Sequence, residues 1–173
     1  AREIVIAGGS WSADMGRRLG LRLPIQPAKG YHVTFKNPPR CPRTPMILTE
    51  AKVGVGPMVD KLRFAGTLEL AGLDMEINRR RVDAILRAIP QYMPELRPGQ
   101  MELMEVWRGL RPCTPDGLPF VGRPKKLTNV TVAAGHATIG VSLGPVTGKL
   151  VAQLIADENP SIDLSALDVD RFN

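Results

Sequence analysis

The residues best suited to chemistry lie in one Gly- and Pro-rich stretch, residues 106–154. Arg111 precedes Pro112 there, and the surrounding prolines predict a rigid bend just after a strand. A planar guanidinium on a restrained backbone can bind a carboxylate through two parallel hydrogen bonds. The alternative is a surface arginine that pairs with Asp116, whose Asp-Gly sequence is first of all a turn signal.

A second chemical signal is a set of glycines after the apolar run at 129–134. Glycines so spaced either serve positive φ and tight packing or let backbone N–H groups face a ligand. The helix start that follows would stabilise negative charge placed there. His136 lies in this loop, as a structural hydrogen-bonding residue or as a base. A nucleoside-triphosphate loop is excluded, because Leu150 follows Lys149 where Ser or Thr is required. The glycines are Gly135, Gly140, Gly144 and Gly148.

Composition bounds the class of protein. The 173 residues are 43% hydrophobic, enough for one domain core or two small lobes. No apolar run is long enough for a transmembrane helix, and the first ten residues lack the pattern of a signal peptide. Cys41 and Cys113 form no disulfide framework and no C-x-x-C site, which favours free thiols in a reducing, cytoplasmic setting. With only His32 and His136, a histidine-rich metal site is not expected.

The chain is basic, with a net charge of +6. A positive net charge of this size is compatible with binding to nucleic acid, to an anionic membrane surface or to an anionic ligand. The one arginine run, Arg79–Arg81, lacks interleaved aromatic residues and is typical of a solvated helix start. A non-catalytic basic binding module using this run stays open as an alternative.

The chain begins with a βα pattern, since the apolar run Glu3–Ala7 is typical of a buried parallel strand. Gly8 and Gly9 then predict a turn that either approaches a phosphate or is simply tight. The following helix would take Ser10 or Ser12 as its N-cap and end at Gly20.

The middle of the chain predicts an antiparallel sheet and one helix. Strands are expected at His32–Phe35, Met46–Leu48, Leu62–Leu70 with a break at Gly66, and Met101–Trp107, with a glycine-rich connection at Lys52–Met58. A helix capped by Asn78 carries an apolar stripe from Val82 to Met93. Toward the C-terminus we expect a strand at Asn129–Ala134 and a loop at Gly135–Gly144. Pro145 would be the first residue of the last helix.

Four separated motifs, in order, give the chain a family resemblance. They are IVIAGGSWS, PAKGYHVTF, LRFAGTLELAGLDMEINRRRVDAIL, and GLRPCTPDGLPFVG followed by AAGHATIGVSLGPVTGKLVAQLI. Together they resemble the FAD-dependent amino-acid oxidase and dehydrogenase family, with bacterial D-amino acid dehydrogenases most alike and glycine and sarcosine oxidases as cousins. Ala137-Thr138, where glycine oxidases often place an arginine, favours the dehydrogenase side.

The resemblance implies an α/β or α+β fold. A substrate domain with a mixed or antiparallel sheet would occupy residues 24–108. Residues 1–23 and 109–173 would be the late parts of a Rossmann-like FAD domain. The G-x-G-x-x-G unit that holds the FAD pyrophosphate is absent from the sequence. The chain also starts in a strand without an initiator methionine. We therefore expect a C-terminal fragment, whose missing partner is the N-terminal FAD-binding part and which is itself inactive.

The resemblance also implies site residues. Arg111 matches the arginine that binds the substrate carboxylate, and Tyr31 would approach the substrate cavity. Ser10 and Trp11 match a turn near the cofactor. The loop that lines the flavin ring matches Gly135, His136, Ala137, Thr138, Ile139 and Gly140.

The chemistry implied is oxidative deamination of an amino acid to a 2-oxo acid by hydride transfer to FAD. It depends on orientation more than on a general base, so no catalytic side chain and no metal are expected. An amine oxidase acting on glycine or sarcosine is the alternative within the family. A dehydrogenase of this kind would pass electrons to a respiratory chain at the inner-membrane surface, and nucleic acid is not an expected partner.

Overall fold

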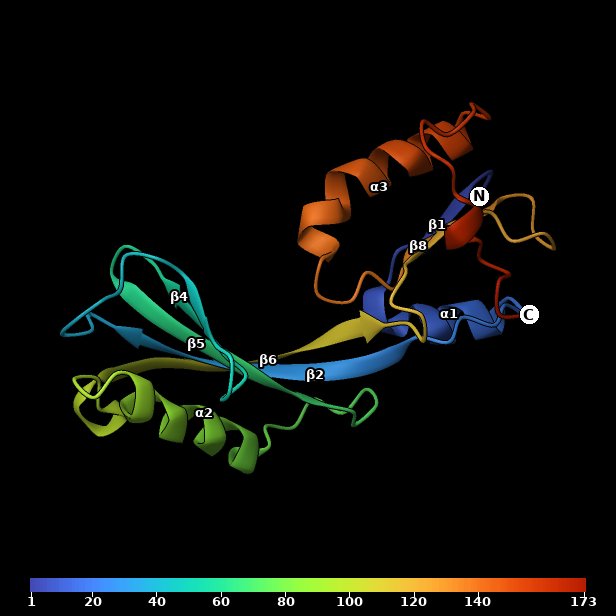
Figure 1. Ribbon diagram of the computed structural model, residues 1–173. Coiled ribbons are helices and arrows are strands. Elements are labelled where there is room, and N and C mark those ends of the chain that lie inside the picture. The colour runs from blue at the N-terminus through green and yellow to red at the C-terminus, as the bar shows by residue number, and fades with distance from the viewer. The chain divides into compact units, whose positions relative to one another are not determined.

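The computed structural model describes all 173 residues, which divide into two compact units. Unit 1 comprises residues 1–28 and 110–173, and unit 2 comprises residues 29–109. The chain passes from one unit to the other along strands β2 (Gln26–Lys36) and β6 (Glu102–Cys113) (Figure 1). Unit 2 is therefore an insertion within unit 1. The combination of helices with mixed and antiparallel sheets confirms the predicted fold class.

Unit 1 is built on a small mixed sheet with the strand order β1-β8-β7. β1 lies parallel to β8 and β7 lies antiparallel to it, and the apolar β8 is almost entirely buried. Helices α1 and α3 lie on opposite sides of this sheet (Figure 1). The bounds are β1 Ile4–Ile6, β7 Phe120–Gly122, β8 Val130–Ala134, α1 Ser12–Arg18, α3 Gly140–Ile155, and two short 3-10 turns at Gly9–Trp11 and Ser165–Leu167.

The start of α1 differs from the prediction. Trp11 occupies the N-cap position without a side-chain hydrogen bond, so neither Ser10 nor Ser12 is the cap. The 3-10 turn that precedes α1 directs both serine side chains into the protein, where they are buried. The end of the helix is as predicted, because Gly20 has a φ of +73° that suits a glycine after a helix.

The start of α3 was also predicted wrongly. The helix begins at Gly140, inside the expected loop, and Pro145 is its sixth residue. Proline removes the bond that its N–H would make to the carbonyl of Val141. Val141 is 95% exposed, so water can reach that carbonyl. Of the apolar residues along this helix only Leu150 is buried.

Unit 2 is built on an antiparallel sheet with the strand order β3-β4-β5-β2-β6. The segment Lys52–Met58, expected as a connection, contains strand β4, in which Gly54 and Gly56 pair with Ala65 and Arg63. Neighbouring strands on both sides override the low strand preference of glycine. The remaining bounds are β3 Met46–Leu48, β4 Val53–Pro57 and β5 Lys61–Glu69.

Strand β5 runs without interruption through Gly66, where a break was expected. The irregularity lies one residue later, where the pairing with β2 shifts register between Lys29 and Tyr31. Thr67 has a φ of +61° there, as in a bulge with one extra residue. Such a bulge generally bends a strand and increases its twist.

Helix α2 (Arg79–Tyr92) covers one face of the sheet of unit 2 (Figure 1). Asn78 is its N-cap as predicted, and its Oδ1 accepts a hydrogen bond of 3.2 Å from the Arg80 N–H. The predicted stripe faces the sheet, with Ile85 and Ile89 fully buried. A 3-10 turn follows at Pro98–Gln100. None of the helices is both long and apolar enough to cross a membrane.

Candidate functional site

The two glycine turns of unit 1 leave the same edge of its sheet. β1 and β8 are parallel, with Ile6 opposite Val132, so the residues after each strand emerge side by side. Ligands of α/β proteins bind outside the carboxyl ends of parallel strands. The fold therefore brings the turn at Gly8–Ser12 and the loop Gly135–Gly140 to one edge.

Two buried hydroxyl groups mark the first of these turns. Ser10 is 3% exposed and Ser12 is fully buried, and neither Oγ has a hydrogen-bond partner. An unpaired buried hydroxyl costs free energy, so each of these groups needs a partner from outside the chain, such as water or a ligand. Trp11 between them is 47% exposed. The family motif pointed to Ser10 and Trp11 but not to Ser12, whose burial follows only from the 3-10 turn.

Two of the four glycines singled out in the sequence have a structural reason to be glycine. Gly135 has a φ of +84°, and a Cβ there would lie 2.6 Å from Thr114 Cγ2. Gly140 approaches His136, with a virtual Cβ 3.1 Å from the histidine Cβ. Gly144 and Gly148 have no atom within 4 Å of a virtual Cβ. The packing interpretation therefore holds for Gly135 and Gly140.

The start of α3 offers free donors beside this loop. Its N-cap, Ile139, makes no side-chain capping bond, and Ile139 and Thr138 are exposed. The first N–H groups of a helix have no partner within the helix and carry roughly half a positive charge. Such an end accepts an anion or an electron-rich ring edge.

His136 is placed as a structural residue. Its Nε2 lies 3.0 Å from Thr147 Oγ1 on α3, so the ring joins the loop to the helix. Burial of the ring lowers the pKa of His136 below its ordinary value, which keeps it neutral at pH 7. The geometry favours the hydrogen-bonding role over a base.

Arg111 lies within strand β6 and not in a bend after it. β6 is the last strand in the sheet order, and an edge strand tolerates the missing N–H of Pro112. The suggested pairing with Asp116 is wrong, because Asp116 pairs with Arg171 at 2.8 Å. Arg111 is half-buried as a residue, and its guanidinium makes no hydrogen bond or salt bridge in the structure.

One backbone hydrogen bond joins the end of β6 to the glycine loop. The N–H of Ala137 donates to the carbonyl of Pro112 at 3.0 Å. Ala137 adopts a φ of +46°, unusual for a residue with a side chain. The loop is therefore held beside the residue that follows Arg111.

Tyr31 belongs to unit 2, whereas every other predicted site residue belongs to unit 1. It is 1% exposed in the core of unit 2. Its hydroxyl donates to Glu69 and accepts a bond of 3.3 Å from the Asn78 N–H. Burial raises the pKa of Tyr31, so the hydroxyl keeps its proton. Contact between Tyr31 and a substrate stays a prediction.

A buried lysine beside Tyr31 had no signal in the sequence. Lys29 is 1% exposed, and its Nζ donates to Asp74 at 2.6 Å and to the carbonyl of Glu76 at 2.9 Å. The bond to Asp74 raises the pKa of Lys29 and lowers that of Asp74. Its partners lie more than 40 positions away, beyond the reach of local patterns.

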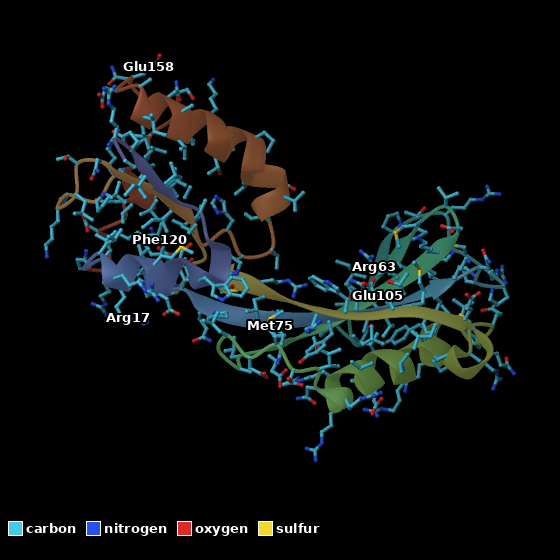
Figure 2. All side chains as sticks on the ribbon, turned by 180° about the vertical axis from the view of Figure 1, so that it is seen from behind. Arg17, Arg63, Met75, Glu105, Phe120 and Glu158 are labelled. Carbon is cyan, nitrogen blue, oxygen red and sulfur yellow. The ribbon has the colours of Figure 1, made fainter.

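The sheet of unit 2 has one face covered by α2. Its other face carries polar side chains, and Figure 2 shows Arg63 and Glu105 turned away from α2. The His32 ring is stacked on Trp107, with the ring centroids 5.0 Å apart. Burial lowers the pKa of His32. Arg79–Arg81 form the exposed first turn of α2, as in a solvated helix start.

Comparison with protein families gives a match over residues 1–154 to the family DAO, described as FAD dependent oxidoreductase. The chain belongs to this family. D-amino acid dehydrogenases of Bradyrhizobium diazoefficiens and Xanthobacter autotrophicus are 32% and 35% identical to it, over 99% and 97% of the chain. The resemblance of the sequence to FAD-dependent amino-acid oxidases and dehydrogenases is thus confirmed.

Solved structures agree with this family. Glycine oxidase from Geobacillus kaustophilus has a TM-score of 0.89 and 31% identity, and it is matched by the whole of this chain. Iminodiacetate oxidase from a Chelativorans species has a TM-score of 0.87 at 24% identity, which supports the fold alone. The chain spans 41% and 40% of the length of the two dehydrogenases and 46% of the glycine oxidase.

Proposed function

We propose that this chain is the substrate-binding and flavin-facing part of a flavin-dependent amino-acid oxidoreductase, a D-amino acid dehydrogenase. The observation that carries the proposal is Arg111, a half-buried residue with an unpaired guanidinium, whose neighbour Pro112 is hydrogen-bonded to Ala137 of the loop. Sequence similarity to D-amino acid dehydrogenases over almost the whole chain supports the substrate class. In this proposal unit 1 contributes to the FAD domain and unit 2 is the substrate domain.

The residues present fit a flavin. The unpaired hydroxyls of Ser10 and Ser12 would meet polar atoms of the cofactor. The uncapped start of α3, behind residues 135–140, would face the electron-rich pyrimidine side of the ring. FAD, when bound, accepts the α-hydrogen of the substrate as a hydride.

The chain itself binds and orients the substrate. Arg111 would take the substrate carboxylate through two charge-assisted hydrogen bonds, which sets the position of the α-carbon. Loss of the α-hydrogen as hydride and of an amino proton to solvent leaves an imino acid. Water then hydrolyses the imino acid to a 2-oxo acid and ammonia. His136 is neutral and bonded to Thr147, and no side-chain base is required.

Substitution of Arg111 tests the proposal in the full-length protein. Arg111→Ala removes bonds to a charged group that are worth about 1.5–3 kcal/mol, so KM should rise roughly ten- to a hundredfold with the flavin still bound. Arg17→Ala is the matched control, because Arg17 is exposed on α1 and pairs only with Asp14 (Figure 2). An unchanged KM in Arg111→Ala, or a purified full-length protein without flavin absorption bands, would refute the proposal.

A second substrate class is favoured by one comparison. The glycine oxidase match at a TM-score of 0.89 supports glycine or a secondary amine as the alternative substrate. A panel of D-amino acids, glycine and sarcosine, assayed by both dye reduction and oxygen consumption, separates the two. Preference for glycine with oxygen as acceptor would replace the dehydrogenase assignment.

The electron acceptor in the dehydrogenase proposal is a respiratory-chain component reached at the membrane surface. The net charge of +6 suits an anionic surface. Cosedimentation of the full-length protein with anionic but not neutral vesicles, weakened by salt, is expected. Equal sedimentation with both kinds of vesicle would count against this part.

A further inference from the structure

The C-terminal segment of the chain is bound tightly to unit 1. Val169 is 1% exposed, and the Phe172 ring packs edge-on against Phe120 with the centroids 6.0 Å apart. Arg22 on the far side donates to the Phe172 carbonyl at 2.9 Å. The buried Val169 and the bond from Arg22 anchor the segment apart from Arg171, whereas the aromatic pair is shared with it, since the Arg171 guanidinium lies 5.0 Å from the Phe172 ring centroid.

All three nitrogen atoms of the Arg171 guanidinium donate hydrogen bonds. Nε donates to Asp116 Oδ2 at 2.8 Å, and Nη2 donates to Asp116 Oδ1 at 3.1 Å and to the Leu118 carbonyl at 2.7 Å. Nη1 donates to the Asp168 carbonyl at 3.0 Å. The group also lies 3.9 Å from the centroid of the Phe120 ring, and its side chain is only 13% exposed. A planar donor fork with four of its five N–H groups bonded holds its partners in one geometry.

What Arg171 holds is the turn between β6 and β7. Asp116 Oδ1 accepts the Leu118 N–H at 3.1 Å, and Thr114 Oγ1 donates to the Leu118 carbonyl at 2.8 Å. Arg171 therefore binds both the carboxylate and the carbonyl that close the turn. The same contact lowers the pKa of Asp116 to about 2, so the carboxylate stays charged at working pH.

The turn is connected to the proposed site by two short contacts. Thr114 Cγ2 lies 2.6 Å from the position that a Cβ of Gly135 would take, so the methyl group packs against the start of the loop. Two residues earlier, the Pro112 carbonyl accepts the Ala137 N–H at 3.0 Å. Movement of the turn would shift the loop and the end of the strand that carries Arg111.

We propose that Arg171 is a positioning residue, which holds the Thr114–Leu118 turn and through it the Gly135–Gly140 loop and Arg111. The proposal rests on the function proposed above. Arg171 does more than fasten the C-terminal segment to unit 1, because it donates hydrogen bonds to the Thr114–Leu118 turn as well as to Asp168 in its own segment. Arg22 supplies the comparison, since it ties down the same C-terminal segment without touching the turn.

The experiment compares R171Q, D116N and R22Q in the full-length holoprotein. The first readout is hydrogen–deuterium exchange of the Ala137 amide, whose bond to Pro112 reports on the site. We expect about tenfold faster exchange in R171Q and in D116N and no change in R22Q, since a lost charge-assisted bond lowers the cost of local opening. D116N removes the charge of the other partner in the Arg171–Asp116 ion pair, so it tests the same contact if R171Q fails to fold.

The second readout is the steady-state oxidation of a D-amino acid. KM should rise roughly tenfold in R171Q with a smaller change in kcat, because a displaced Arg111 loses substrate binding. The double variant D116N/R171Q should be no worse than either single variant. Equal effects of R171Q and R22Q on both readouts, or an unchanged Ala137 exchange rate in R171Q and D116N, would overturn the proposal.

The two proposals fail in different ways. If R111A leaves KM unchanged, the function assigned to Arg111 is wrong, whereas the Ala137 exchange rate still decides whether Arg171 holds the loop. If R111A raises KM and R171Q speeds exchange without raising KM, the function stands and Arg171 does not position the site.

Discussion

The substitution Gly135→Ala should destabilise the protein through two separable effects. The φ of +84° is a conformation in which a side chain costs roughly 1–2 kcal/mol. The added methyl would also lie 2.6 Å from Thr114 Cγ2, and overpacking of this kind costs about 1–3 kcal/mol. The expected loss of unfolding free energy is therefore about 2–5 kcal/mol.

Thr114→Ser separates the two effects. Serine removes the Cγ2 methyl and keeps the hydroxyl that donates to the Leu118 carbonyl. In the double variant the steric cost disappears and the backbone cost of roughly 1–2 kcal/mol stays. The two substitutions should therefore couple favourably, by about 1–3 kcal/mol.

The assay is urea unfolding of the full-length protein, with Gly148→Ala as the matched control. Gly148 lies inside α3 at an exposed position with no atom near a virtual Cβ. Alanine there should be neutral or stabilise by about 0.5–1 kcal/mol. A Gly135→Ala variant as stable as the wild type, or one that Thr114→Ser does not rescue, would refute the reasoning.

Three further predictions concern ionisable groups. The pKa of Asp116 is about 2 in the folded chain against an ordinary value of 3.8, so its contribution of about 1–2 kcal/mol is complete above pH 4 and is lost as pH falls toward 2. In Asp116→Asn the unfolding free energy should therefore fall less between pH 4 and pH 2 than in the wild type. The same fall in both proteins would contradict this. Lys29→Met should cost roughly 3 kcal/mol at pH 7, measured by urea unfolding. Because the folded pKa of Lys29 is raised, this cost should shrink only as pH rises above 10.5, and a loss near neutral pH would contradict the assignment. His136→Gln should leave kcat within about threefold, whereas loss of a general base would lower it roughly 10²–10⁴-fold.

Local patterns predicted the elements whose cause is local. The strand β1, the cap at Asn78 and the left-handed Gly20 each depend on a few neighbouring residues. The predicted burial of β1 was wrong in part, because Ile4 and Val5 are exposed and only Ile6 is buried. The stripe of α2 also follows from its own spacing, since Ile85 and Ile89 face the sheet. These features could be derived from the sequence without knowledge of the fold.

The errors occurred where distant residues decide the conformation. Gly54 and Gly56 form a strand because β5 pairs with them, although glycine itself disfavours one. Pro145 looked like a helix start, yet an exposed carbonyl at Val141 makes it tolerable inside α3. In each case tertiary context outweighed a local preference.

The residues of the candidate site stay predictions, and they come from two sources. The family motif supplied Arg111, Ser10 and the loop after β8, whereas composition and spacing left their roles open. Ser12 and Arg171 were missed, since the burial of one and the partner of the other depend on the fold. Arg171 lies 55 positions from Asp116, a distance that no local pattern covers.

The discontinuous unit 1 has a consequence for biosynthesis. Ile4 pairs with Val130, which follows it by 126 positions (130 minus 4), and all of unit 2 is translated between them. At about 5–20 residues per second, the ribosome needs roughly 6–25 seconds to supply the partner strand. Unit 2 can complete its antiparallel sheet during that interval, before β8 is available to pair with β1. Synonymous codons that slow translation within unit 2 should therefore lengthen the time before this pairing can form.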